Sequence, residues 1–315
     1  MRAPLRSTRA DGTPLTLVSP IVNTTLISSS LFAGFCQGRL TLTTATPITT
    51  ADVTAATTIY FTPYAGNLLA LYDGSTKWTV YPFTEISLAL GTLTNALPYD
   101  VFVYDNAGTP TLESLAWTSA TARATALTTQ NGIYVKNGAI TRRYLGTFYT
   151  TATTTTEDSY AKRFVWNYYN RVKRPMRVFE ATDTWTYSID TWRQTNASTA
   201  NQLDFVIGLA EAPVYAFALS LSRSDTVGVA PSTGIGEDDT TIPTSTSLIG
   251  RSSYLTIGAN VPAQGEYVSF PPIGRHFLAW LERGGGNPVA IQTWVGDEGG
   301  VTRYDQTGIV GWIEG

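Results

Sequence analysis

The stretch TRRYLGTFYTTATTTTEDSYAKRFVWNYYNRVKRPMRV, residues 141–178, carries the densest aromatic and basic patterning in the chain. Two segments of it, 143–150 and 162–172, are predicted β-strands because β-branched and aromatic residues recur with a period of two. In the second segment the alternation gives one face with Phe164, Trp166 and Tyr168 and another with Arg163, Val165, Asn167, Tyr169 and Arg171. Pro175 has no N–H to donate, so we expect it to end this ladder.

Basic residues therefore gather along the second strand and its end: Arg163, Arg171, Lys173, Arg174 and Arg177. One interpretation is contact with an acidic partner surface or phosphate, since Arg recognises carboxylates and phosphates in a bidentate manner. The other is a solvated edge strand that its charges protect from further pairing. Nucleic acid is not an expected partner, because the chain has a net charge of −3, opposite to the basic footprint of such proteins.

The composition outside this stretch also favours sheets. The 315 residues are 43% hydrophobic, enough for a large core, and only 14% charged, against about 25% in an average soluble domain. Thr supplies roughly one residue in six and suits strand faces that meet water. This composition is typical of extracellular and virion β-proteins.

The chain has one cysteine, Cys36, and one histidine, His276. A single Cys cannot form an intramolecular disulfide or a Cys-based zinc cluster, and a single His excludes the usual multi-His metal sites. No nucleophile elbow, P-loop or dinucleotide fingerprint is present. We therefore predict a protein that is not an enzyme, with no catalytic residue, cofactor or bound metal.

Residues 1–34 are predicted to form an extended arm that attaches the chain to a partner, with Arg2, Arg6 and Arg9 as its basic residues. The apolar run that follows these arginines contains Pro20, Asn23 and three consecutive serines, so it is a poor secretory signal and too polar to span a bilayer. Membrane insertion is not expected.

The remaining chain reads as short strands every 8 to 12 residues, separated by Gly, Asn and Asp turns. This spacing predicts an all-β fold of antiparallel β-sandwich or jelly-roll-like domains. We place a first β domain at 35–140 and a second at 141–315, with one possible helical turn at 121–128. The expected elements also include apolar core strands at 203–209 and 214–221, a polar loop at 222–247, and a hairpin joining 276–282 to 289–295.

Candidate sites are few. Glu237, Asp238 and Asp239 could hold Ca²⁺, as could Asp297 and Glu298, but neither set has the spaced ligand pattern of known calcium loops. His276 alternates with Leu278 and Trp280, which favours packing in a core or an interface. Most of the aromatic residues are expected in the core, and we predict that a few remain exposed for contact with a partner: Tyr169, Trp192 and Tyr304.

Three stretches resemble a group of tailed-bacteriophage virion proteins: GRLTLTTATPITTADVTAATTIYFTPYAGNLLALYDG, RRYLGTFYTTATTTTEDSYAKRFVWNYYNRVKRPM and GRHFLAWLER. The resemblance covers most of residues 37–315 but not the arm. It implies a β-rich component on the exterior of a phage particle, usually oligomeric and attached by its amino-terminal end.

The sequence hypothesis is a non-enzymatic virion structural protein, such as a head decoration, spike or tail-fibre component, which contacts other capsid or tail proteins and forms a homotrimer. An alternative is a receptor-binding tail protein that recognises host surface polysaccharide through aromatic and charged side chains. A third is a polysaccharide depolymerase, which would require a pair of suitably spaced carboxylates.

Overall fold

The computed structural model describes residues 32–287, 289–298 and 305–315. These residues form strands, turns and one short 3-10 helix, η2 (Thr195–Ala197), and no α-helix occurs among them. The predicted all-β sandwich class is confirmed. The expected helical turn at 121–128 is wrong, because bends there lead directly into strand β9 (Leu127–Gln130). The predicted arm, with Arg2, Arg6 and Arg9, lies outside the described residues except for its last three positions.

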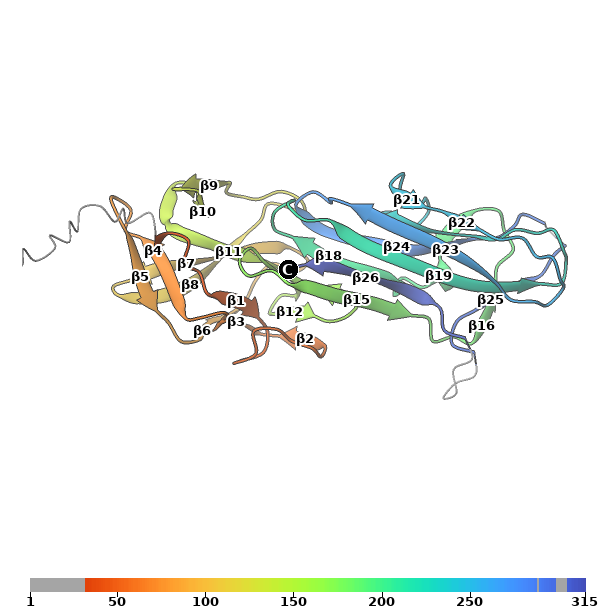
Figure 1. The fold of residues 1–315 in the computed structure, drawn as a ribbon, viewed down its shortest axis with the longest axis horizontal. Coiled ribbons are helices and arrows are strands. Elements are labelled where there is room, and N and C mark those ends of the chain that lie inside the picture. Colours follow the sequence, from red (N-terminus) through yellow and green to blue (C-terminus); the bar gives the residue numbers. More distant parts are fainter. Residues whose placement is uncertain (1–31, 288, 299–304) are drawn as a thin grey trace, which may run out of the picture.

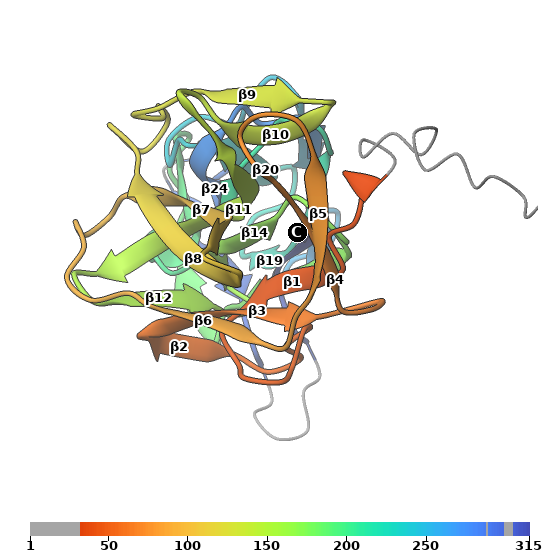
Figure 2. The same cartoon turned by 90° about the vertical axis from the view of Figure 1, so that its left-hand side faces the viewer.

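The molecule is elongated, and Figure 1 shows its two halves end to end. The first half contains a three-stranded sheet and a two-stranded hairpin, which pack around longer strands that belong to the large sheet (Figure 2). The strands of this half are β1 (Gly38–Thr41), β2 (Val53–Ala56), β3 (Thr58–Pro63), β4 (Leu68–Tyr72), β5 (Trp78–Pro82), β6 (Ile86–Ala89), β7 (Pro98–Asn106), β8 (Thr109–Ala116), β9 and β10 (Ile133–Lys136).

The β4–β5 and β7–β8 hairpins reverse at Asp73-Gly74 and at Asn106-Ala107-Gly108, turn residues of the kind that the sequence analysis expects between strands. In the first, the Asp73 carboxylate accepts hydrogen bonds from the backbone N–H groups of Ser75, Thr76 and Lys77. These donors favour the charged carboxylate and lower the pKa of Asp73. A turn aspartate thus fixes the reversal of the chain.

Strand β11 (Ala139–Ala152) is the 14-residue spine of the molecule. It pairs with β7 and β10 of the first half and also with β12 (Thr155–Asp158) and β14 (Val165–Asn167). The domain boundary that we predict between residues 140 and 141 falls inside this strand. Since its partners include β7 and β10, β11 belongs with the first half.

The second half is a sandwich of two sheets. The large sheet continues into it through the parallel pairing of β13 with β18, and its strands here are β13 (Lys162–Arg163), β17 (Trp192–Gln194), β18 (Gln202–Ile207), β20 (Ser232–Glu237), β22 (Gly250–Arg251) and β24 (Gly274–Arg283). The second, seven-stranded sheet contains β15 (Lys173–Phe179), β16 (Thr184–Thr186), β19 (Val214–Ser224), β21 (Ser247–Leu248), β23 (Val261–Ser269), β25 (Gln292–Val295) and β26 (Gly308–Glu314).

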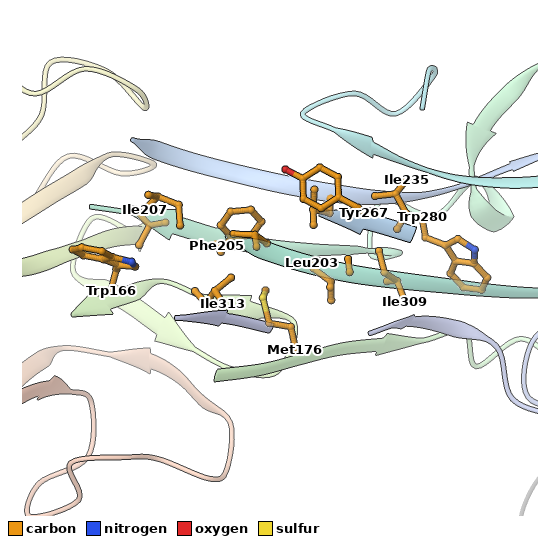
Figure 3. Packing of buried hydrophobic residues seen from close by; sticks show 14 of the residues in the cluster. Trp166, Met176, Leu203, Phe205, Ile207, Ile235, Tyr267, Trp280, Ile309 and Ile313 are labelled. Atoms are coloured by element: carbon orange, nitrogen blue, oxygen red, sulfur yellow. The ribbon is translucent and has the colours of Figure 1, made fainter. Parts of the chain in front are cut away.

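The main core fills the space between these two sheets (Figure 3). Large side chains come from both layers, including Phe205 and Trp280 from the large sheet and Tyr267 from the smaller one. Strand β19 contributes only small or short side chains to it, since Ala216, Ala218 and Ser220 face inward. The core interdigitates because bulk from one sheet meets small residues on the other.

Four sequence expectations about strands need correction. The predicted strand 162–172 is broken into β13, β14 and a bend. Pro175 does not end a ladder but lies inside edge strand β15, opposite Trp312, where its missing N–H faces no ladder partner. The predicted polar loop 222–247 contains buried strand β20. The predicted hairpin does not form, because β24 lies in the large sheet whereas β25 pairs with β19 and β16 in the other.

Gly284 explains how the chain crosses between the sheets after β24. A Cβ atom there would lie 2.3 Å from the backbone carbon of Ser188. Only glycine permits this approach, so the sequence GGG marks a close crossing of two segments and not a hairpin turn.

Candidate functional site

Four arginines are buried, namely Arg39, Arg143, Arg163 and Arg174. Arg39 and Arg174 link the two halves, whereas the carbonyl acceptors of Arg143 lie in the first half. We call this group the arginine junction. Buried charges are costly unless hydrogen bonds satisfy them, so each guanidinium must be matched by acceptors on neighbouring segments. Those acceptors come from residues distant in sequence, and the junction therefore joins segments that strand pairing alone leaves separate.

Arg143 projects from β11 toward the start of the described chain. Its Nη1 donates to the carbonyl oxygens of Ala33 at 2.8 Å, Phe35 at 2.9 Å and Ala70 at 2.8 Å. Its Nε donates to the Tyr169 hydroxyl at 3.1 Å, and the guanidinium lies 4.6 Å from the Tyr169 ring centre. One side chain thus holds the end of the predicted arm and the residues after it against the spine.

Arg39 performs the same task for the other end of the described chain. Its Nη2 donates to the Gly315 carbonyl at 2.7 Å, and its remaining nitrogens donate to the carbonyls of Pro47 and Asn170. Burial, together with the nearby Arg174 charge, lowers the pKa of Arg39 to about 10. The side chain is still charged at neutral pH, so its carbonyl partners remain satisfied.

Asp158 carries the third contact of the junction. It accepts from Arg163 at 3.1 Å on one oxygen and from Arg174 at 2.8 Å on the other. Arg163 also donates to the Pro175 carbonyl, and Arg174 to the Thr49 hydroxyl. Burial lowers the pKa of Arg174. These contacts fasten the edge strand β15 to β12 and to the loop before β2.

The predicted basic surface cluster is therefore divided. Arg163 and Arg174 are interior residues whose hydrogen bonds go to Asp158 and to backbone carbonyls. The prediction that they contact a partner is therefore wrong. Arg171 is half-buried and pairs with Glu211 at 3.0 Å. Lys173 and Arg177 are exposed on β15. Sequence patterning did not separate the two kinds because it treated 162–172 as one strand ended by Pro175, whereas Arg163 lies on β13 and Arg174 on β15.

The predicted exposed aromatics have different outcomes. Tyr169 is not exposed: its hydroxyl is bonded to Arg143 and its ring packs beside the first core, where burial raises the pKa of the phenol. Trp192 is half-buried on β17, with the Arg283 guanidinium 5.9 Å from its ring centre. Tyr304 lies outside the described residues.

Strand β24 presents His276, Leu278, Trp280 and Glu282 on its inward face, so titratable groups flank the apolar core. His276 is 2% exposed, as the sequence interpretation of a packing role expects. One ring nitrogen lies 2.7 Å from the Asp238 carboxylate and the other 2.9 Å from the Pro272 carbonyl. Both partners are acceptors, so the ring fixes the loop before β24 against the end of β20.

Glu282 is fully buried, and burial raises its pKa to about 7. Its oxygens accept from the Trp185 indole at 2.8 Å, from Arg193 at 2.8 Å and from the Asn196 N–H at 3.1 Å. Sequence reasoning missed this group, although its place two residues after Trp280 in an alternating strand predicts an inward position.

A perturbed carboxyl in a cleft is a candidate catalytic acid. Glu282 does not fit that role, because every one of its contacts is an internal donor and none of its surface reaches solvent. Its geometry instead fixes η2 and the short strands β16 and β17 around the end of the core.

Three of the five acidic residues considered for Ca²⁺ have separate partners. Asp238 binds His276, Asp239 accepts from Thr241, and Glu298 pairs with Arg223 at 3.0 Å. In the described part of the chain, no cluster of three or more His, Cys, Asp or Glu side chains could hold a metal ion. The Cys36 thiol is buried, and burial raises its pKa to about 11.

The end of the sandwich farthest from β4 and β5 has a polar hollow of about 260 Å³. Its lining includes Asp190, Ser232, Arg251 and Arg283, with Arg283 donating to Asp190 at 2.7 Å. Trp192 and Ser232 are the cross-strand neighbours of Arg283 on its two sides. An aromatic ring, two guanidinium groups and a carboxylate thus lie close together at this end.

Comparison with known proteins leaves the chain without a family: no family model and no curated protein matches it. Among solved structures it is similar to three Bacillus thuringiensis insecticidal proteins. For delta-endotoxin Cry8Ea1 the identity is 7% and the TM-score 0.26, covering 83% of this chain and 49% of that one. For a Cry1Da tryptic core variant the identity is 8% and the TM-score 0.21, covering 91% of this chain and 54% of that one. For Cry7Ca1 the identity is 6% and the TM-score 0.20, covering 89% of this chain and 51% of that one.

This chain spans about half the length of those three structures. TM-scores at this level carry no argument about fold or function. Within the described residues, no helix has the length and apolar character needed to cross a membrane. The fold and the junction define the class only as an all-β sandwich protein whose two halves are joined by buried arginines.

Proposed function

We propose that this chain is a non-enzymatic structural protein on the exterior of a tailed-phage particle, attached through its amino-terminal residues. The observation that carries the proposal is the Arg143 contact. Its guanidinium binds the carbonyls of Ala33, near the end of the predicted arm, and of Phe35, directly after it, and joins them to the spine β11. A pull on the arm would therefore act on the core of the molecule and not on a loose terminal strand.

The shape of the body agrees with such an attachment. The first described residues lie at one end of the long axis, and the loops after β19 and β24 lie at the other (Figure 1). A protein held at its first end would present these loops away from the particle. The stretches that carry the phage resemblance include β11 and β24, which are long strands of the large sheet.

The test is incorporation into particles. A chain that begins at Phe32 keeps every Arg143 acceptor, so we expect it to fold with an unchanged unfolding midpoint but to be missing from purified particles. A full-length chain with residues 2–31 in scrambled order controls for length and composition. Retention of the shortened chain at full-length levels would contradict attachment through the arm.

The alternative is recognition of host surface polysaccharide, and the polar hollow at the far end favours it. Sugars bind to aromatic faces and to planar polar groups, and Trp192, Asp190 and Arg283 provide these in one place. We expect that glycan binding by the whole protein, measured on an array of host polysaccharides, is lost in Asp190→Ala. Binding that Asp190→Ala leaves unchanged would remove the hollow from consideration.

A further inference from the structure

The seven-stranded sheet has two faces, and the one turned away from the core is strongly apolar. On β19, Tyr215, Phe217, Leu219 and Leu221 alternate with the small inward residues and are half-exposed. Neighbouring strands extend this face with exposed side chains: Val268 at 54%, Phe270 at 61%, Phe179 at 43% and Val310 at 36%. We call this surface, completed by Trp312 and Leu248, the outer face.

Strand registers show that these residues form one continuous surface. One row across the sheet runs through Pro175, Trp312, Tyr215 and Val268, and the next through Arg177, Val310, Phe217, Glu266 and Leu248. The Tyr215 and Trp312 rings are stacked with centres 6.0 Å apart. Contiguous exposed apolar surface of this kind marks an interaction site, whereas scattered apolar residues do not.

Opposite charges lie on the two sides of the apolar surface. Edge strand β15 presents Lys173 and Arg177, both exposed; Lys173 lies opposite Glu314 of β26, whereas Arg177 has no ion-pair partner among the described residues. On the other side, β23 presents Glu266, which also has no described ion-pair partner and interacts with Tyr215 on the same face. Arg177 and Glu266 thus lie in one row, with apolar residues between them.

Such a surface is complementary to itself. If copies are arranged around a rotation axis parallel to the strands, with their outer faces toward the axis, the β15 side of each copy lies beside the β23 side of the next. Arg177 then meets Glu266, which shares its row, and the apolar rows meet each other. Charge complementarity of this kind fixes register and suppresses other partners.

The size of the surface is also suitable. Four strands about 4.8 Å apart and seven residues at about 3.4 Å each give roughly 460 Å² of flat area per copy, and the short strand β21 extends it. The smallest specific interfaces bury about 600 Å² per partner, and protruding aromatic side chains add to the flat value. We infer that the outer face is where this chain binds further copies of itself around an axis parallel to its strands. This inference does not depend on where the protein is located.

The experiment measures the mass of the full chain in solution by sedimentation equilibrium and native mass spectrometry. We expect the unmodified chain to have the mass of two or three copies at micromolar concentration. Val268→Lys combined with Val310→Lys places two charges in the apolar rows and should raise the dissociation constant at least 100-fold. A single-copy mass for the unmodified chain would overturn the inference.

The matched control combines Val227→Lys with Leu255→Lys. Val227 is 53% exposed and Leu255 is 87% exposed, and both lie on loops at the far end of the sandwich. This pair should leave the mass unchanged. Equal dissociation by the control pair would place the contact elsewhere and overturn the assignment to the outer face.

A charge reversal tests the orientation of the copies. Arg177→Glu and Glu266→Arg should each raise the dissociation constant about tenfold, and the chain with both changes should recover most of the unmodified affinity. Recovery requires that the two residues meet across the contact, because no described contact joins them within one chain. Additive weakening in the double variant would contradict an axis parallel to the strands.

Discussion

The arginine junction and the outer face distribute polarity in opposite ways. At the junction, four guanidinium groups lie inside the molecule and each finds acceptors there. On the outer face, aromatic and aliphatic residues lie at the surface, among them Val268 and Phe270. The described contacts of the first region lie within one copy, whereas we infer that the second region is covered by another copy, and this difference separates a structural site from an interaction site.

The largest effect should come from removing a junction cation. Arg143→Ala leaves the carbonyls of Ala33, Phe35 and Ala70 without their donor in a buried position, and we expect a loss of about 4 kcal/mol in the free energy of unfolding. Urea denaturation measures it. Arg142→Ala is the control: its half-exposed pair with Glu113 is worth about 1 kcal/mol or less. Similar losses in both variants would contradict the importance of burial.

The second effect concerns Glu282, the buried acid of the sandwich. Its pKa of about 7 in the folded state exceeds the ordinary value of 4.5, so the folded chain binds this proton more tightly than the unfolded chain. The associated stability is fully present below about pH 4.5 and is lost as the pH rises through 7, up to about 3 kcal/mol in total.

Glu282→Gln imitates the protonated acid and removes this loss. We expect the variant and the unmodified chain to have similar free energies of unfolding near pH 4.5, with the variant more stable at pH 7.5. Denaturation curves across this range measure the difference. Arg193→Met removes the compensating charge. Its free energy of unfolding should therefore fall more between pH 4.5 and pH 7.5 than that of the unmodified chain. A smaller fall in this variant would argue against the electrostatic account.

The third prediction compares the two faces of β19 directly. Ala218 is fully buried against the core, so Ala218→Leu must displace packed side chains and should cost about 2 to 3 kcal/mol. Leu219 points outward in the next position, and Leu219→Ala should cost the dissociated chain less than about 1 kcal/mol. Unfolding in urea at low protein concentration measures both. A reversed order of the two costs would mean that the faces are assigned wrongly.

The sequence predicts much of this fold, because period-two alternation and turn residues are local properties. The hairpins β4–β5 and β7–β8, the spine β11 and the all-β class follow from them. Alternation does not reveal which face is inside. In β19 the alternation places large apolar residues such as Phe217 and Leu219 on one face, and this face looks like the core face. Ala216 and Ala218 face inward instead, because Trp280 and Phe205 of the opposite sheet already fill the core there.

The candidate site was harder to predict than the fold. Arg163 and Arg174 look like surface charges, since burial depends on acceptors such as Asp158 and the Pro175 carbonyl that only the folded chain brings near. Arg39 and Arg143 gave no signal for the same reason, as their acceptors are backbone carbonyls and have no sequence signature. Long-range contacts decide burial of charge, whereas local pattern decides the strand.

The smallest effect on stability should come from Val268→Thr on the outer face. Thr has nearly the same shape and suits a strand, and Val268 is 54% exposed, so the dissociated chain should change by less than about 0.5 kcal/mol in its free energy of unfolding. Self-association stabilises only the folded chain, so the melting temperature of the unmodified protein should rise with protein concentration. In Val268→Thr this rise should be weaker, while melting at high dilution stays unchanged. The control is Val227→Thr, at 53% exposure on a far-end loop. Its melting temperature should follow that of the unmodified protein at every concentration. A weaker rise in Val227→Thr would place the contact between copies at the loop end and not on the sheet.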